Sequence, residues 1–437
     1  MSGVRPYSTA RRGVTLLELL VVIGIMLVLL AVAIPAMQFL PEGRRVREAT
    51  RSVTVFFGAV RNKAITTGRP VGVILERLER QPQVCAVLRE AEVPPAYGGD
   101  SEDSMVRPWL QFQWTDPLSG GARHFVRVQV QTYPLNPPLS NLLIRRGDVM
   151  QLNYQGAWYT IVDFPGDNSS TDEDFPLDAL GFIDFGVGVD NDPPLALDGW
   201  VDTHFLTLEL DPQGVHAVPW NATAPPVPTQ LLTVPFKIYR QPVASSGRVL
   251  ELSRGAVIDL AASGFDSLLP DWNTEPVAHS FEPDPTSVGT ILQPVVVMFF
   301  PNGSAQQIYY SRRTYDPTTG NFAGCLYQGR PIAEPIHFLV GIWERIPAQP
   351  RAVNQQTPGP WPMDPSQAED GLHNMHDATN RWVSLNPQTG LVTVALLAAD
   401  GHDATTNMNV PLGATLAEQL YNGRSMVREA QISEGGR

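Results

Sequence analysis

Residues able to do chemistry are few in this chain of 437 residues, and one of them stands in an unusual place. Glu18 is the only charged side chain in the apolar segment 14–34, which is 21 residues long (34 − 14 + 1). At about 1.5 Å of rise per residue, a helix of that length matches a hydrocarbon core of roughly 30 Å. A carboxylate is costly in lipid, so it must lie at the interface or have a task. Glu18 is therefore the first candidate functional residue.

Two further groups of side chains have the chemistry of metal ligands. His373, His376 and Asp377 lie in the stretch HNMHD, where two imidazoles at this spacing can share one face. No further ligand follows from the spacing, so we predict no metal there. Segment 163–202 carries eleven Asp or Glu, whose oxygens suit a hard cation such as Ca²⁺. Its spacing does not fit an EF-hand loop, so a solvated acidic loop is favoured, with a Ca²⁺ site as the alternative.

Other routes to chemistry are weakly supported. The chain has no nucleophile-elbow, zinc-protease, P-loop or dinucleotide-binding motif, so we predict that it has no catalytic residues and is not an enzyme.

Cys85 and Cys325 lie far apart in the sequence and form either one disulfide or two buried thiols. The net charge of −13 argues against nucleic acid as a partner, because phosphate binding needs clustered cations.

The apolar segment itself allows three interpretations. It is typical of a plain membrane anchor, with Glu18 reaching the interface near the start of the segment. It is also typical of a secretory signal peptide that has a basic start and an Ala31-Val32-Ala33 cleavage site, which would leave Ile34 as the first residue. The third interpretation comes from a resemblance to a known family.

The stretch RRGVTLLELLVVIGIMLVLLAVAIP closely resembles the N-terminal signature of type IV prepilins and type II secretion pseudopilins. The resemblance implies that 1–13 is a leader, which prepilin peptidase removes after Gly13, and that Val14 becomes the methylated N-terminus. Val14 departs from the Phe or Met that the family most often has there. Glu18 is then the fifth mature residue, and the resemblance implies that it pairs with the α-amino group of Val14 in a neighbouring subunit. Pro35 falls where these helices carry a kink.

The resemblance also implies where the protein works and with which partners. It places a single-pass helix in the bacterial inner membrane and the bulk of the chain in the periplasm. The expected partners are prepilin peptidase, other pseudopilins or pilins, and an inner-membrane assembly platform driven by a cytoplasmic ATPase. The positive-inside rule does not settle this orientation, because arginines flank the apolar segment on both sides.

The rest of the chain shows a helical pattern followed by strand patterns. Apolar residues recur every three or four positions, which predicts an amphipathic helix that ends at Gly68 and Pro70; they are Val46, Ala49, Val53, Phe56, Val60 and Ala64. Arg44 to Arg51 form an exposed basic turn, either solvated near lipid headgroups or in contact with a subunit. Beyond it, runs rich in Val, Ile, Phe and Thr predict β-strands at 71–78, 124–131, 204–210, 231–240, 294–300 and 335–343.

Shorter matches refine the resemblance. The blocks RNKAITTGRPVGVIL, GRVLELSRGAVIDL and VVVMFFPNGSAQQIYY look like GspH/FimT-type minor pseudopilins, with Pro301, Asn302 and Gly303 as a turn. The stretch RWVSLNPQTGLVTVAL looks like their closing hairpin. The implied fold class is α+β, with a long N-terminal transmembrane and amphipathic α-helix packed on a β-rich, pilin-like globular head. Such proteins are usually shorter, so a large insertion is expected, and segment 147–236, which lacks Lys and Arg, marks it.

The patterns and the resemblance together imply one organisation and one favoured function. The expected parts begin with a leader at 1–13, followed by the transmembrane half of the helix at 14–36 and its amphipathic half at 37–69. A periplasmic head follows at 70–412, with the acidic insertion at about 147–236. The chain ends with a tail at 413–437 that has a short helix around Leu416, Leu420 and Val427. The favoured function is that of a minor pseudopilin or pilin-like structural subunit of a type II secretion or type IV pilus system, without a cofactor. The alternatives are a FimT-like DNA-uptake pilin, which a basic head would favour, and a secreted β-protein released by signal peptidase.

Overall fold

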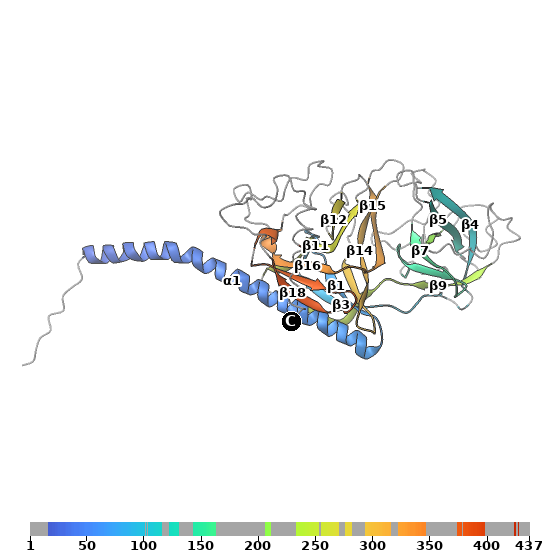
Figure 1. The fold of residues 1–437 in the computed structure, drawn as a ribbon, viewed down its shortest axis with the longest axis horizontal. Helices are drawn as coiled ribbons and strands as arrows, with labels where there is room; N and C mark the ends of the chain where they lie inside the picture. The colour runs from blue at the N-terminus through green and yellow to red at the C-terminus, as the bar shows by residue number, and fades with distance from the viewer. Residues whose placement is uncertain are drawn as a thin grey trace, which may run out of the picture.

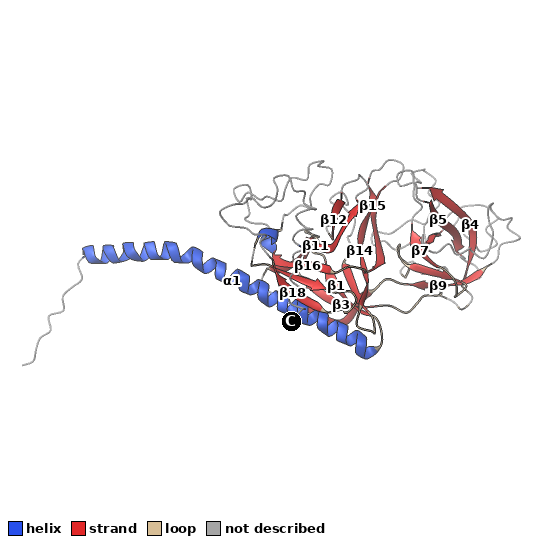
Figure 2. Ribbon diagram, in the orientation of Figure 1, coloured by secondary structure: helices blue, strands red, loops and turns tan. Residues whose placement is uncertain are grey.

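The structure is a computed structural model whose described residues fall in several ranges. They are 16–100, 102, 104–115, 122–130, 143–162, 206–210, 233–252, 255–270, 276–281, 293–315, 322–346, 374–377, 379–397, 424 and 427. Within the N-terminal helix, the side chains of 17–19 and 27–42 are not part of the description. The described residues form one long α-helix and three antiparallel sheets, one of which closes into a barrel (Figure 1 and Figure 2).

Helix α1 runs without interruption from Leu16 to Thr67, a length of 52 residues. It continues through Pro35 and Pro41, so the two predicted halves, 14–36 and 37–69, belong to one element. The helix ends as predicted at Gly68, whose φ of 63° allows its N–H to donate to the Ala64 carbonyl at 3.1 Å. The kink at Pro35 stays a prediction.

The first sheet follows the helix and has six strands. Its strands are β1 (Val71–Glu76), β3 (Val87–Glu92), β10 (Val243–Glu251), β13 (Val295–Phe299), β14 (Ala305–Tyr315) and β15 (Phe322–Pro331). Their order is β10-β3-β1-β13-β14-β15, with antiparallel pairing throughout.

The second sheet is built mainly from the later part of the chain. Its strands are β2 (Val84–Cys85), β11 (Ala256–Pro270), β12 (Pro276–Ser280), β16 (Ile336–Ile342), β17 (Arg381–Leu385) and β18 (Val392–Leu396). The order is β12-β11-β16-β17-β18, and β2 also pairs with β11. The pairing of β17 with β18 confirms the predicted closing hairpin, because its register joins Leu385 to Val392.

The main core lies where α1 meets these two sheets, and α1 runs along them in Figure 1. The predicted helical stripe is confirmed, since all six of its side chains are buried in this core: Val46, Ala49, Val53, Phe56, Val60 and Ala64. Phe57, which the stripe did not include, packs between the two sheets. Its ring centroid lies 6.3 Å from that of Phe299 in β13 and 5.6 Å from that of Phe338 in β16.

The third sheet is a closed barrel with its own core. Its strands are β4 (Met105–Thr115), β5 (Ala122–Val130), β6 (Val149–Leu152), β7 (Trp158–Val162), β8 (Leu206–Leu210) and β9 (Val234–Tyr239), in the closed order β4-β5-β8-β7-β6-β9. Apolar side chains from all six of these strands form the core between them, with further apolar side chains from outside the strands.

All strands of the barrel lie within one interval of the chain, and the expected insertion at 147–236 falls inside that interval. The chain leaves the first sheet after β3 and returns at β10, and these two strands pair with each other. The barrel strands therefore all lie between Glu92 and Val243, and that this interval is an insertion into a pilin-like head stays a prediction. The predicted segment 147–236 leaves out β4 and β5. It was defined by its lack of Lys and Arg, and only the later part of the interval lacks them.

The six predicted strand runs are all confirmed, by β1, β5, β8, β9, β13 and β16. Of the predicted terminal helix, the description includes Arg424 and Val427, both helical and buried. Val427 packs with Ala262, Leu339 and Trp382 on the second sheet. Leu416 and Leu420 lie outside the described residues.

The membrane segment predicted at 14–36 lies partly outside the description, both at its start and in many of its side chains. Across the residues that are described, no helix offers a stretch both long enough and apolar enough to cross a membrane.

Candidate functional site

The N-terminal part of α1 presents an apolar surface that no part of the described chain covers. We call residues 16–26 the apolar arm. Seven of its large side chains expose half or more of their surface, and Leu16 is 83 % exposed; they are Leu16, Leu20, Val21, Val22, Ile23, Ile25 and Met26. In Figure 1 this part of the helix projects away from the sheets. A continuous exposed apolar surface of this kind marks a contact with a membrane or with other proteins.

The residues predicted to act in processing and assembly fall at or near this arm. Gly13 and Val14 lie outside the described residues. Glu18 and Pro35 both lie in α1, but their side chains are not described. The proposed pairing of Glu18 with an amino group therefore stays a prediction.

The helix leaves the head at Gly43, and a short loop segment holds it there. Val46, one turn later, is the first described helix residue that is fully buried in the main core. A Cβ atom at Gly43 would lie 3.4 Å from the Cβ of Thr379, so this segment touches the helix backbone closely. We call residues 374–377, 379 and 380 the exit clamp, because Thr379 among them meets α1 where it emerges.

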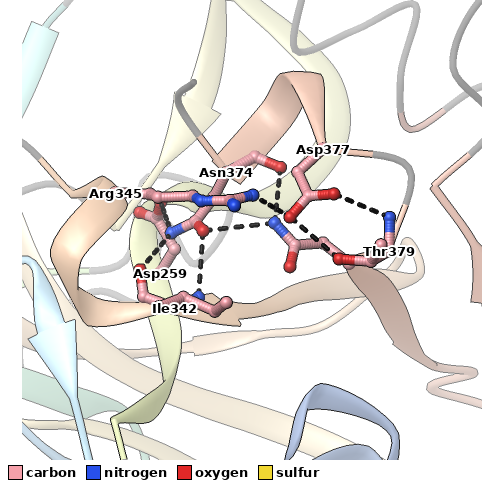
Figure 3. A network of polar contacts seen from close by, with 7 residues as sticks. Asp259, Ile342, Arg345, Asn374, Asp377 and Thr379 are labelled. Atoms are coloured by element: carbon pink, nitrogen blue, oxygen red, sulfur yellow. Dashed lines mark hydrogen bonds and ion pairs between the residues drawn. The ribbon is translucent and has the colours of Figure 1, made fainter. Parts of the chain in front are cut away.

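Asn374 attaches the exit clamp to the second sheet, as Figure 3 shows. Its side-chain amide is fully buried: its Oδ1 accepts from the Ile342 N–H at 3.0 Å, and its Nδ2 donates to the Ile342 carbonyl at 3.1 Å. The same Nδ2 lies 3.2 Å from a carboxylate oxygen of Asp259. Asn380 closes the loop by donating to the Asn374 carbonyl at 2.8 Å. The amide thus pairs with the end of β16 as a neighbouring strand would.

Asp377 orients the other end of the exit clamp. Its carboxylate forms an ion pair with Arg345, which lies in the short 3-10 helix η3 (Trp343–Arg345). The same carboxylate accepts from the Thr379 N–H at 2.9 Å and from its hydroxyl at 2.8 Å (Figure 3). These bonds fix Thr379 against the helix at Gly43. Asp377 therefore has a structural role in positioning the helix exit.

The metal hypothesis for the HNMHD stretch finds no geometric support within the described residues. His376 belongs to the 3-10 helix η4 (Asn374–His376), its side chain is not described, and His373 lies outside the description. The described part of the chain holds no group of three or more His, Cys, Asp or Glu placed to bind a metal. The acidic segment 163–202, with its alternative Ca²⁺ site, lies outside the described residues.

A group of arginines lies beside the helix exit. We call Arg44, Arg45, Arg47, Arg51 and Arg381 the basic collar. The first four lie on α1, where Arg44, Arg47 and Arg51 are exposed as predicted and Arg45 is half-buried. Arg381 lies in β17, and the pKa of its guanidinium is lowered first by desolvation and then by the neighbouring Arg47 cation. In the described part of the chain, no carboxylate forms an ion pair with any of the five.

The far end of the helix is bonded to two turns, the predicted turn at 301–303 and the turn of the predicted closing hairpin. The Nε of Arg61 donates to the Gly303 carbonyl at 3.0 Å and to the Thr389 carbonyl at 3.1 Å. Gly303 and Gly390 have φ values of 83° and 63°, which favour glycine. A Cβ atom at Gly390 would lie 2.0 Å from the Gly303 carbonyl oxygen, so the two turns pack against each other. On the other side of the helix, Lys63 forms an ion pair with Glu90 in β3.

A buried carboxylate joins the barrel to the first sheet. Asp148 lies just before β6, and its two oxygens accept from the backbone N–H groups of Arg145 at 2.7 Å and Gln241 at 2.9 Å. Gln241 stands in the segment that returns from the barrel to β10. Burial raises the pKa of Asp148 from 3.8 to about 7, although those two N–H groups lower it. We call this contact the barrel joint.

The neighbourhood of the barrel joint is tightly packed against β15. Gly147 has a φ of 90°, and a Cβ atom there would lie 2.0 Å from the Tyr327 carbonyl oxygen. Burial raises the pKa of Tyr327. Burial also raises the pKa of Tyr309, and the charge of the nearby Asp148 carboxylate raises it further. Neither Gly147 nor Asp148 was singled out from the sequence, because no local pattern shows that the two ends of the insertion meet.

The two cysteines do not pair. Cys85 in β2 is a free and fully buried thiol, and the disulfide with Cys325 that the sequence left open is not formed. Cys85 sits opposite Ile258 of β11, whereas Cys325 sits in β15 of the other sheet, opposite Arg313 of β14. Burial raises the pKa of the Cys85 thiol to about 12. Its environment is that of a packed core residue.

Comparisons with models of known families, with curated proteins and with solved structures find no match to this chain. The functional argument therefore depends on the residues and the geometry of the chain itself. These define a β-rich head that carries one projecting apolar helix, with a basic collar and a polar clamp where the helix emerges.

Proposed function

We propose that this chain is a pilin-like structural subunit, of the minor pseudopilin type, in a type II secretion or type IV pilus system. Prepilin peptidase cuts it between Gly13 and Val14, and Val14 is then methylated. The subunit joins other pseudopilins or pilins in a short filament that is built on an inner-membrane platform. Before assembly, a single helix holds it in the bacterial inner membrane with its head in the periplasm.

The observation that carries this proposal is the division of α1 into two surfaces. From Val46 to Ala64 the helix is part of the main core, and its stripe packs on two sheets. In the apolar arm the same helix leaves large apolar side chains exposed. One part of this helix is packed in the core, and the other part leaves its apolar side chains exposed. The exposed part needs either lipid or the helices of neighbouring subunits around it. A filament subunit uses both environments in turn.

The attachment of the helix to the head supports a mechanical role. Arg61 bonds to both turns at one end, and the exit clamp touches Gly43 at the other. Phe57 and the buried stripe fill the interval between them. A subunit that is pulled out of a membrane by its neighbours must transmit force from helix to head, and a helix fixed at both ends of its contact can do so.

The barrel suggests a specialised place in the filament. It adds a second folded body, inserted between β3 and β10, to the head. A body of that size would crowd a tightly wound array of identical subunits. We therefore assign the chain to a tip or to another position with few neighbours, and not to the repeating body of the filament.

The test of this function is the assembly of a Glu18→Ala variant. Because a buried carboxylate that meets an amino group orients its partner, its loss should leave leader cleavage intact but block entry into filaments. Glu48→Ala is the matched control, since Glu48 is an exposed carboxylate on the same helix. Sheared filaments are probed for each variant, and leader cleavage is followed by the change in chain mass. Normal assembly of Glu18→Ala would contradict the pairing.

A further inference from the structure

We infer that the basic collar is a binding surface for the phosphodiester headgroups of anionic lipids. The inference rests on the proposed function, because it requires that the apolar arm enter a membrane. It adds a lipid class to which the head is drawn before the subunit joins a filament.

The arrangement of the collar concentrates positive charge on one side of the helix exit. At about 100° per residue, Arg44, Arg47 and Arg51 fall within an arc of roughly 60° on α1. Arg381 joins them from β17, close enough to Arg47 for the two cations to interact. Like charges at this spacing destabilise a helix by a small amount unless an anion lies among them.

No part of the described chain supplies that anion. Two carboxylates lie close to the collar in sequence: the side chain of Glu42 is outside the description, and Glu48 is exposed and forms no ion pair with the collar. Asp377, in the adjacent exit clamp, is paired with Arg345. The collar is thus a local cationic surface on a chain whose net charge is −13. The ligand that it fits is anionic and comes from outside the described residues.

The position of the collar selects a lipid headgroup as that ligand. The sequence from Val14 to Leu40 has Glu18 as its only charged residue and would be about 40 Å long as a helix. The hydrocarbon core takes roughly 30 Å of that length, so the remainder lies in the headgroup layer. Arg44 follows Leu40 by four residues, or about 6 Å. The collar therefore begins at the level of the lipid phosphates.

The direction of the side chains agrees with this position. In an α-helix the Cα–Cβ bonds tilt toward the N-terminus, and long side chains lean the same way. For the arginines of α1 this direction is toward the apolar arm. Their guanidinium groups can therefore reach back to phosphates while the backbone stays above the membrane, and a guanidinium binds phosphate oxygens in pairs.

The experiment uses the full chain reconstituted into vesicles of phosphatidylcholine alone or of an equimolar mixture with phosphatidylglycerol. Spin-labelled lipids of the two classes report which lipid contacts the protein. We expect a preference for phosphatidylglycerol of about fivefold, the effect of one arginine held near an anionic surface, or more where several act together. The preference should decrease in high salt, because salt screens the attraction.

Matched variants assign the effect to the collar. The variant with Arg44→Gln, Arg47→Gln and Arg51→Gln should show equal contact with both lipids. The control replaces Arg69, Arg80 and Arg248 by Gln, which removes the same charge from exposed positions outside the collar, and should keep the preference. A preference that survives the collar substitutions, or that is absent in the wild type, would overturn the inference.

Two further arms separate this inference from its alternatives. Inorganic phosphate at matched ionic strength should leave the lipid preference unchanged, whereas its loss would show that the collar takes a free anion and would overturn the lipid assignment. Flotation with the neutral vesicles tests the proposed function separately. A chain that does not float with either vesicle contradicts membrane insertion, while a chain that floats with both but has no lipid preference contradicts only the role of the collar.

Discussion

Acidification should strengthen the barrel joint, because Asp148 holds a proton more tightly in the folded chain than in the unfolded one. Burial raises the pKa of its carboxyl to about 7 from an ordinary value of 3.8. Between these two values the folded chain keeps a proton that the unfolded chain has lost. Stability at this site is therefore greatest below about pH 4, decreases as pH rises toward 7, and is constant above 7. Over that window of about 3 pH units, the change approaches 4 kcal/mol.

An Asp148→Asn variant separates this effect from all other titrating groups. Asn has one acceptor oxygen, so it can serve only one of the two N–H groups, those of Arg145 and Gln241, that bond to Asp148. That loss should make the variant less stable than the wild type by about 1 kcal/mol at pH 4. Since Asn does not ionise, the variant should be the more stable protein at pH 7.5, by about 3 kcal/mol.

Amide hydrogen exchange gives the assay for this reversal. Peptides that cover β6 and β9 report the free energy of opening of the strands on either side of the barrel joint. The difference between the two proteins is compared at pH 4 and pH 7.5 after correction for intrinsic exchange rates. The charged groups that act on the carboxyl in the structure are Arg145 and Arg240, both of which favour its ionised form. A difference that keeps its sign and size across this pH range would show that these cations dominate and that the joint does not titrate.

Three other substitutions or treatments test the packing around the helix. Phe57→Ala should lower the free energy of unfolding by about 3–5 kcal/mol, because it empties a fully buried site between two sheets, whereas Val55→Ala, at a position 64 % exposed on the same helix, should change it by less than about 0.5 kcal/mol in urea titrations. Asn374→Ala should cost about 2–4 kcal/mol and speed hydrogen exchange in the exit clamp, since it leaves the Ile342 N–H and carbonyl without their partner; unchanged exchange there would contradict the clamp. Cys85 should resist alkylation by iodoacetamide at pH 8 in the folded protein and react on unfolding, because burial raises its pKa to about 12; rapid labelling of the native protein would show that β2 is open.

Local patterns predicted an element of this fold well where a few consecutive residues carry its pattern of burial. The stripe from Val46 to Ala64 had the period of a helix and is buried as predicted. The runs that became β13 and β16 were apolar apart from His337, and both strands are buried along their whole length. The turn at Gly303 was marked by its Pro-Asn-Gly sequence. In each case the information lies within a few residues.

Other strands were missed for local reasons. Strand β4 contains Pro108, and a proline inside a run argues against a strand. The structure accommodates it with a shift in register between Pro108 and Leu110 against β5. The block GRVLELSRGAVIDL indicated only the end of strand β10; the start of the strand contains Ser245 and Ser246, which resemble a turn, and its pairing with β3 also shifts there. These irregularities are invisible to a search for alternating apolar residues.

The contacts that define the candidate sites could not be predicted, because they join residues that are distant in sequence. Asn374 bonds to Ile342, and Asp148 bonds to the backbone at Gln241. The barrel likewise depends on closing β4 against β9. Such pairings are selected by the packing of the whole chain and leave no periodic signal. Asp377 was noticed for its chemistry, yet its role follows from its pairing with Arg345.

The central claim is that the apolar helix becomes the free, processed N-terminus of a filament subunit. The measurement that tests it most directly is the mass of the N-terminal peptide of the chain extracted from bacterial membranes. The proposed function predicts a peptide that begins at Val14 and carries one methyl group on its α-amino nitrogen. A peptide that still contains residues 1–13, or one that begins at Ile34, would contradict it.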